Sequence, residues 1–301
     1  MTAPLPPLLL RPHYVAKPWG GRRLADDLGR TDLPDGPIGE SWEVYDLARP
    51  DGTREGSIVD GGPHDGRALR DVLGHDVPLL LKVIDAREDL SVQLHPGGPD
   101  GKEEAWVTLG AGSRVAVADA GRTFASAAAP AAGAWLDALA CHDLAPGCTE
   151  SCTPPALTHI PPGTVHAILA GSLLYEVQNP ADVTWRIDDH GRVGLDGKPR
   201  ALHLAEAAPL LAEPTPAPAA TEADAAGRTR LRGERFDIVL LPPGTHEAPD
   251  AQALHVTAEA EVVDAGGDRM AVPRGRTVWL PGPVRHVASD GWMVAARARV
   301  S

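Results

Sequence analysis

A cluster of potential metal ligands in residues 79–108 places the strongest constraint on how this chain can fold. Two runs within it are rich in Leu, Val and Ile and are typical of β-strands. Because side chains two positions apart in a strand project to the same face, Gln93 and His95 should point together. Nine residues after His95, beyond a Pro/Gly turn, stands Glu104, which a hairpin can return to that face. In an extended segment the neighbouring Glu103 points to the opposite face.

A fourth potential ligand lies far along the chain, where residues 160–166 read Ile-Pro-Pro-Gly-Thr-Val-His. The Pro-Pro-Gly turn leads into an apolar strand that begins at His166. Each residue alone could be an ordinary strand polar group, a surface carboxylate or a core histidine, but the ordered combination favours a metal site. An amide oxygen, two imidazoles and a carboxylate suit Zn²⁺ best and accept Mn²⁺, Fe²⁺ or Co²⁺. The predicted metal ligands are Gln93, His95, Glu104 and His166.

This pattern resembles the metal site of a cupin barrel, with Gln-x-His in place of the usual His-x-His. With Leu-Lys-Val-Ile-Asp-Ala before it and Gly-Lys-x-Glu after it, the pattern resembles the type I mannose-6-phosphate isomerases. Supporting matches occur in order along most of the first two thirds of the chain. They are Lys-Pro-Trp-Gly-Gly at 17–21, Gly-Glu-Ser-Trp-Glu at 39–43, Leu-Tyr-Glu-Val-Gln at 174–178, Thr-Trp-Arg at 184–186 and Gly-Lys-Pro-Arg-Ala-Leu-His at 197–203.

The resemblance implies a zinc-dependent aldose-ketose isomerase that interconverts mannose 6-phosphate and fructose 6-phosphate through an enediolate. Position by position, the four predicted ligands match the zinc ligands of the family. Arg186 matches its catalytic arginine, which we assign to stabilising the developing oxyanion. Glu176 is the candidate proton shuttle, and Lys102 is a further catalytic candidate. The residues expected near the substrate phosphate are Ser91, Lys82, Lys17 and Arg192.

Short apolar runs separated by Gly and Pro turns predict an all-β fold with a few short helices. Residues 159–178 show the pattern most clearly, as a meander of hairpins. Helices are expected at 66–75, closed by Gly74, at 134–141 and at 202–213.

We expect two cupin-type, jelly-roll-like β-barrels, with helical segments capping the first. Residues 1–213 would form an N-terminal metal-binding barrel with helical additions, 214–228 a Pro/Ala-rich linker, and 229–301 a degenerate C-terminal barrel without metal. A weak internal repeat supports the second barrel, because His286 follows a Pro-Gly-Pro turn much as His166 follows Pro-Pro-Gly. The other predicted ligands have no counterparts there.

The charge of the chain indicates the kind of partner it binds. Its net charge is −13, from 28 basic and 41 acidic residues, so no general attraction to nucleic acid or to an anionic membrane is expected. A small diffusible sugar phosphate fits better. Because the overall field repels an anion, a local cluster of Lys and Arg must meet its charge.

Cysteine usage and hydropathy favour a cytoplasmic protein, which we expect to be a monomer or a homodimer. The three cysteines, Cys141, Cys148 and Cys152, give no secreted disulfide framework, and Cys148-x₃-Cys152 lacks a matching second pair for a metal site. The N-terminal segment has no basic n-region, and no apolar run approaches the ~20 residues that cross a bilayer.

Three alternatives to this function remain open at this stage. Departures from the family pattern at Val107, 179–181 and His190 alter the expected sugar pocket. The chain could therefore isomerise a non-phosphorylated or different aldose, or be a non-catalytic cupin that binds a sugar. A metal-dependent dioxygenase is a third possibility, although this ligand set leaves fewer open positions than a facial triad.

Overall fold

The computed structural model describes residues 5–49, 51–124, 133–144, 154–247 and 250–299. Within these ranges the chain is built mainly from antiparallel strands, with three short α-helices and short 3-10 turns. The helices are α1 (Arg23–Asp26), α2 (Leu69–Leu73) and α3 (Leu204–Ala212), and two of the 3-10 turns are Gly62–His64 and Leu136–Ala138. The prediction of an all-β fold with a few short helices is confirmed.

Two sheets in the first part of the chain pack face to face around the predicted metal ligands. The six-stranded sheet has the order β11 (Leu157–Ile160), β8 (Glu104–Thr108), β13 (Ser172–Gln178), β6 (Leu80–Ala86), β2 (His13–Gly21) and β3 (Ile38–Val44), and β3 also pairs directly with β6. The five-stranded sheet has the order β10 (Ala140–Asp143), β9 (Arg114–Val117), β12 (His166–Ile168), β7 (Val92–Leu94) and β14 (Trp185–Asp188). A small ribbon of β4 (Asp46–Ala48) and β5 (Arg54–Gly56) lies beside them.

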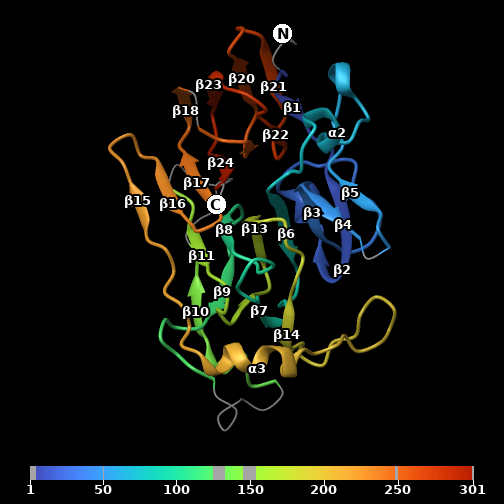
Figure 1. Ribbon diagram of the computed structural model, residues 1–301, viewed down its shortest axis with the longest axis vertical. Helices are drawn as coiled ribbons and strands as arrows, with labels where there is room; N and C mark the ends of the chain where they lie inside the picture. Colours follow the sequence, from blue (N-terminus) through green and yellow to red (C-terminus); the bar gives the residue numbers. More distant parts are fainter. Residues whose placement is uncertain (1–4, 50, 125–132, 145–153, 248–249, 300–301) are drawn as a thin grey trace.

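Two further sheets contain most of the remaining strands. The seven-stranded sheet has the order β1 (Leu8–Leu9), β22 (Thr277–Trp279), β19 (Ala253–Val256), β24 (Met293–Ala298), β17 (Phe236–Leu241), β16 (Thr229–Arg232) and β15 (Thr221–Ala223). The four-stranded sheet has the order β18 (Gly244–Glu247), β23 (Val284–Ser289), β20 (Ala260–Asp264) and β21 (Arg269–Val272). Figure 1 shows most of these strands, in orange and red, at the end of the molecule opposite α3, with β1 in blue beside them.

The four larger sheets pack on one another as layers, with a buried apolar cluster between each pair of neighbours. One cluster joins the five-stranded and six-stranded sheets, through residues such as Ile168 and Trp106. A second, larger cluster joins the back of the six-stranded sheet to the seven-stranded sheet, through residues such as Val83 and Phe236. A third lies between the seven-stranded and four-stranded sheets. The six-stranded sheet is therefore covered on both faces.

The helices show where local sequence signals decided the structure and where they did not. Gly74, in the left-handed conformation at φ 76°, ends α2 as predicted, and α3 packs its buried residues on the outer face of the five-stranded sheet. The helix predicted at 134–141 is wrong. Only a 3-10 turn forms there, and the chain then enters β10, because pairing with β9 overrides a weak local helical preference.

The division of the chain into two barrels joined by a linker at 214–228 stays a prediction. Two strands outside residues 229–301 pair with strands of the expected C-terminal barrel. β1, near the N-terminus, pairs with β22 of the seven-stranded sheet. β15, within the expected linker, pairs with β16. Among the described residues, no helix is long and apolar enough to span a bilayer.

Buried polar side chains cross the apolar contact between the six-stranded and seven-stranded sheets. Arg30 donates to Glu43 at 2.8 Å and to Ser41 Oγ at 3.0 Å, and the Ser41 hydroxyl donates to Glu43 at 2.6 Å. From the other side, the Thr277 hydroxyl donates to Glu43 Oε2 at 3.4 Å, and His255 Nδ1 lies 3.0 Å from Thr277 Oγ1. The ring of Tyr175 stacks on His255. We call the whole group of side chains the rear network: Arg30, Ser41, Glu43, Tyr175, His255 and Thr277.

The order of donors in the rear network places a proton on Nδ1 of His255, and burial keeps the ring neutral. Because the Thr277 hydroxyl uses its proton on Glu43, it can only accept from His255, so Nδ1 carries the imidazole proton. Burial, helped by Arg30, lowers the pKa of His255 to about 3. The ring stacks on Tyr175 at 4.3 Å between centroids, and burial raises the pKa of that phenol.

The buried neutral His255 predicts a specific dependence of stability on pH. An unfolded histidine titrates near 6.5, so between 6.5 and about 3 the unfolded chain binds a proton that the folded chain excludes. The contribution is fully present above pH 6.5 and is lost as the pH falls toward 3. His255→Phe keeps a ring against Tyr175 but has no proton to bind. Between pH 6.5 and about 3, we expect its unfolding free energy to fall less steeply with decreasing pH than that of the wild type, by about 1.4 kcal/mol per pH unit. Urea unfolding at a series of pH values measures it, and parallel profiles for the two proteins would contradict it.

Candidate functional site

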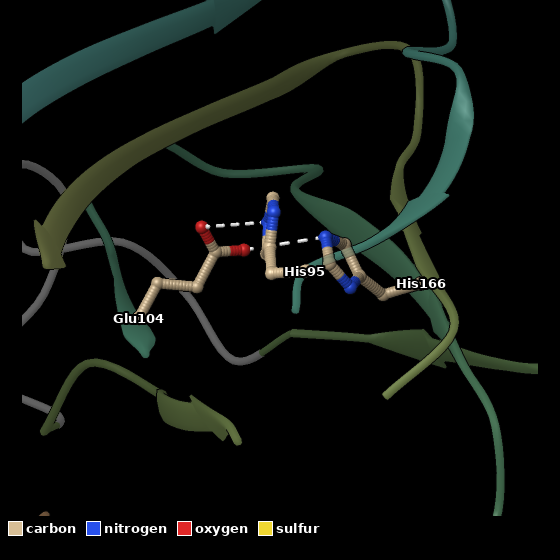
Figure 2. A group of neighbouring side chains, drawn as sticks. All are labelled: His95, Glu104 and His166. Atoms are coloured by element: carbon tan, nitrogen blue, oxygen red, sulfur yellow. Dashed lines mark ion pairs between the residues drawn. The ribbon is translucent and has the colours of Figure 1, made fainter. Parts of the chain in front are cut away.

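Three of the four predicted ligands converge between the five-stranded and six-stranded sheets. His95 directly follows β7, Glu104 begins β8 and His166 begins β12. His95 Nε2 lies 3.2 Å from Glu104 Oε2, and His166 Nε2 lies 3.3 Å from Glu104 Oε1. Figure 2 shows the Glu104 carboxylate turning one oxygen to each imidazole. One donor atom from each of the three residues lies within 4.8 Å of the others, and all three side chains are buried. We call these residues the triad.

Backbone carbonyl groups set the tautomer of each triad histidine. His95 Nδ1 lies 2.8 Å from the Val183 oxygen, and His166 Nδ1 lies 2.9 Å from the Thr164 oxygen. Because a carbonyl oxygen can only accept, each Nδ1 carries the proton and each Nε2 presents its lone pair toward Glu104. This arrangement is the usual outer support of a metal-binding histidine.

The electrostatics of the triad favour the protonation states that metal ligands need. Burial, with a contribution from Lys102, lowers the pKa of His95 to about 4, and burial also lowers the pKa of His166. Burial alone would raise the pKa of Glu104, but the Lys102 ammonium group holds it well below its usual range. The triad therefore presents two neutral imidazoles and one carboxylate at neutral pH.

Gln93, the fourth predicted ligand, lies beside His166 on the five-stranded sheet. The two residues are paired across β7 and β12, and Gln93 Nε2 lies 3.4 Å from His166 Nε2. Its amide oxygen accepts a hydrogen bond from Ser91 Oγ at 3.0 Å. The structure thus brings an amide to the edge of the triad, as the alternation of the strand predicted.

These residues fit a divalent metal ion. His95 Nε2 is a buried nitrogen with no hydrogen-bond partner among the described residues, and it faces a buried carboxylate. Such unpaired groups are costly unless a cation binds between them. Two imidazole nitrogens, a carboxylate and an adjacent amide form the mixed nitrogen and oxygen set that suits zinc.

A line of alternating charges extends from the triad along the six-stranded sheet. Lys102 Nζ lies 2.5 Å from Glu104 Oε2 and 3.8 Å from Glu176 Oε1. Lys82 Nζ lies 3.5 Å from the same oxygen of Glu176, whose other oxygen accepts from Trp106 Nε1 at 3.1 Å. The predicted catalytic residues Glu176 and Lys102 are therefore next to each other and next to the triad.

The line of charges ends at Glu40, which the sequence alone did not assign to the site. Glu40 pairs with Lys17 at 3.0 Å and with Lys82 at 4.0 Å, and it accepts from Trp42 Nε1 at 2.7 Å. Burial would raise the pKa of Glu40, but the two ammonium groups lower it to about 2. Glu40 and Trp42 are two positions apart in β3 and share a face, and the fold turns this face toward Lys82.

Arg186 lies on β14 directly across from Gln93. Its Nη1 donates to the Ala201 oxygen at 2.9 Å, while its buried Nε has no partner among the described residues. Burial lowers the pKa of Arg186, and the positive charges of Arg200 and Arg192 lower it further. The guanidinium groups of Arg192 and Arg200 are thus close enough to act on Arg186.

The residues predicted to meet the substrate phosphate already have partners within the protein. Lys17 and Lys82 are paired with Glu40, and Ser91 is bonded to Gln93. Arg192 donates to the Asp89 carbonyl, and its buried Nη1 has no partner among the described residues.

Glu103 points away from the triad, as the extended geometry of the segment predicted. It lies 2.7 Å from His159 Nε2 and accepts from the backbone N–H groups of Glu234 at 2.9 Å and Arg235 at 2.7 Å. Adjacent glutamates therefore serve opposite faces of β8. Among the cysteines, Cys141 is an exposed free thiol, whereas Cys148 and Cys152 lie outside the described residues.

Curated proteins similar to this chain in sequence are mannose-6-phosphate isomerases. The chain is 31% identical over 233 residues to the mannose-6-phosphate isomerase of Streptococcus mutans, a match that covers 70% of this chain and 69% of the relative. It is 30% identical over 237 residues to mannose-6-phosphate isomerase ManA of Bacillus subtilis, covering 69% of each. The chain spans about two thirds of the length of the curated relatives it matches. No family model matches the chain.

Solved structures share the fold over nearly the whole chain. The crystal structure of mannose 6-phosphate isomerase from Bacillus subtilis aligns with a TM-score of 0.77 at 24% identity, covering 97% of this chain and 100% of that one. A K132A mutant of phosphomannose isomerase from Salmonella typhimurium aligns with a TM-score of 0.71 at 16% identity, covering 98% and 100%. The predicted cupin-type class is confirmed as a set of cupin-like sheets; among the described residues the strand pairings form open sheets, not closed barrels.

The two adjacent glutamates give a matched test of the metal site. We expect Glu104→Gln, which removes the one triad carboxylate, to weaken Zn²⁺ binding at least about a hundredfold. Glu103→Gln makes the same chemical change on the opposite face and should leave the affinity unchanged. Competition with a chromophoric chelator measures both dissociation constants. Equal affinities for the two variants would contradict the assignment of Glu104.

Proposed function

The chain belongs to the mannose-6-phosphate isomerase family, and we propose that it interconverts mannose 6-phosphate and fructose 6-phosphate with one divalent metal ion at the triad. The observation that carries this proposal is the buried triad directly joined to the predicted proton-transfer residues. Glu104 contacts Lys102, and Lys102 contacts Glu176. A metal site alone would suit many reactions, but a metal site beside a buried acid and ammonium suits proton transfer.

Aldose-ketose isomerisation makes three demands on a site. The oxygens on C1 and C2 of the sugar must be oriented, a proton must move between these carbons, and the negative charge of the enediolate must be offset. Sugar phosphates add a fourth demand, a positive group that holds the phosphate.

The metal ion would be held by His95, Glu104 and His166, with Gln93 as the fourth ligand. Zn²⁺ fits this donor set best, and Mn²⁺, Fe²⁺ or Co²⁺ are possible substitutes. When bound, a divalent ion supplies Lewis-acid polarisation of substrate oxygens. The backbone acceptors at Val183 and Thr164 keep the two histidines in the tautomer that binds it.

Glu176 is the residue we assign to moving the proton between the sugar carbons. It is a buried carboxylate outside the triad, and Lys82 and Trp106 hold its two oxygens in place. Lys102 lies between Glu176 and Glu104, where its ammonium group can donate to a substrate oxygen and offset developing negative charge.

The arginines are the better candidates for binding the anionic parts of the substrate. Arg186 Nε and Arg192 Nη1 are buried donors without partners among the described residues, and a negatively charged oxygen would satisfy them. The ammonium of Lys82, in contrast, is already balanced by Glu40 and Glu176. We therefore assign the oxyanion to Arg186 and the phosphate to Arg192, with Lys17, Lys82 and Ser91 supporting the site around them.

Turnover before and after removal of metal tests this function. We expect fructose 6-phosphate to form from mannose 6-phosphate, with a loss of at least about a hundredfold in kcat in chelated, metal-free protein and recovery with Zn²⁺. Chelator already saturated with Zn²⁺ is the control for direct inhibition. Unchanged turnover in protein shown to contain no metal would contradict the metal-dependent reaction.

The same assay separates the alternatives. Faster turnover of free mannose than of mannose 6-phosphate would overturn the phosphate assignment of Arg192. Binding of the sugar phosphate without isomerisation, even with metal restored, would favour a non-catalytic sugar-binding protein. The cytoplasmic location and the choice between monomer and homodimer stay predictions.

A further inference from the structure

The six-stranded sheet carries different chemistry on its two faces. Toward the five-stranded sheet it presents Glu40, Lys82 and Glu176, the charged line that leads to the triad. Residues one position along the same strands face the seven-stranded sheet, where Ser41 and Tyr175 belong to the rear network. The back of the site is therefore covered by residues 229–299, which we call the C-terminal segment.

Strand register joins the two faces, although the β3–β6 pairing has an irregularity between Trp42 and Val44, at Glu43. Across the central strands, Trp42 pairs with Lys82 and Lys82 pairs with Glu176. Glu176 directly follows Tyr175 in β13, and Glu43 lies three positions after Glu40 in β3. A shift of either strand at the rear network is thus a shift of a charged group at the site.

The rear network holds both strands by directional bonds to the C-terminal segment, where Arg30 also donates to the Gly275 carbonyl at 2.5 Å. Thr277 donates to Glu43 on β3, and His255 stacks on Tyr175 of β13. One hydroxyl, that of Thr277, connects the two, because it also accepts from His255. Apolar packing tolerates sliding, whereas a buried ion pair with a fixed order of donors accepts one arrangement.

We propose that the C-terminal segment positions the site from behind, with Thr277 and His255 acting as positioning residues that fix Glu40 and Glu176 through β3 and β13. Neither residue touches the triad or the charged line. Their effect passes through Glu43 and Tyr175. The kinetic consequence rests on the proposed isomerase function, whereas the consequence for the strands does not.

Thr277→Val tests this, because it removes the hydroxyl and keeps the shape of the side chain. We expect kcat for mannose 6-phosphate to fall about tenfold with little change in KM, since small misplacements of catalytic groups are costly. Amide hydrogen exchange in β3 and β13 should also become about tenfold faster. Thr277→Ser, which keeps the hydroxyl, should restore both values.

Thr257→Val is the matched control. Thr257 is also buried in the C-terminal segment, but its hydroxyl donates to the Trp292 carbonyl at 2.8 Å instead. We expect it to lower the melting temperature without changing kcat or exchange in β3 and β13. If Thr277→Val does not fold, His255→Phe removes only the bond between His255 and Thr277 and keeps the ring, so kcat and exchange should change in the same direction by a smaller factor.

Two outcomes separate failure of this inference from failure of the proposed function. If Thr277→Val and Thr257→Val have the same kcat and the same exchange in β3 and β13, positioning is overturned even though the isomerase function stands. If the wild-type protein shows no turnover but exchange rises only in Thr277→Val, the isomerase function fails and positioning of the strands stands.

Discussion

The buried carboxylate of Glu104 is the constraint on which the rest of the site depends. It faces the Nε2 atoms of two imidazoles. The proton of each ring is on Nδ1, on the other side, and is donated to a backbone carbonyl. Lone pairs and negative charge brought together in a dry interior repel one another, so the arrangement requires positive charge. Lys102 supplies one cation, and a divalent ion between the rings would supply the other.

The need to balance this charge explains the sequence of groups that extends away from the triad. Each ammonium group is flanked by carboxylates, from Lys102 to Glu176, then to Lys82 and Glu40. A network of this kind is stable only if every member keeps its partners. It therefore needs rigid strands, and the layers on both faces of the six-stranded sheet provide them.

Sequence reasoning reached the triad because its information is local and periodic. The two-residue spacing of Gln93 and His95 and the Pro-Pro-Gly turn before His166 describe the strand geometry directly. The role of Glu40 and the whole rear network depended on which strands became neighbours, and no local pattern carries that information. The helix predicted at 134–141 was wrong for the same reason, because pairing with β9 outweighed the local helical preference of the segment. The sequence matches for the predicted phosphate residues also say nothing about which carboxylates pair with them, such as Glu40 with Lys17 and Lys82.

Anomalous diffraction at the zinc absorption edge, from a crystal of the zinc-loaded protein with a bound sugar phosphate, tests the central claim most directly. The account predicts one strong peak at bonding distance from His95 Nε2, His166 Nε2 and a Glu104 oxygen, with the Gln93 amide alongside. A zinc-loaded, active protein whose peak lies elsewhere, with these three side chains free of metal, would contradict it.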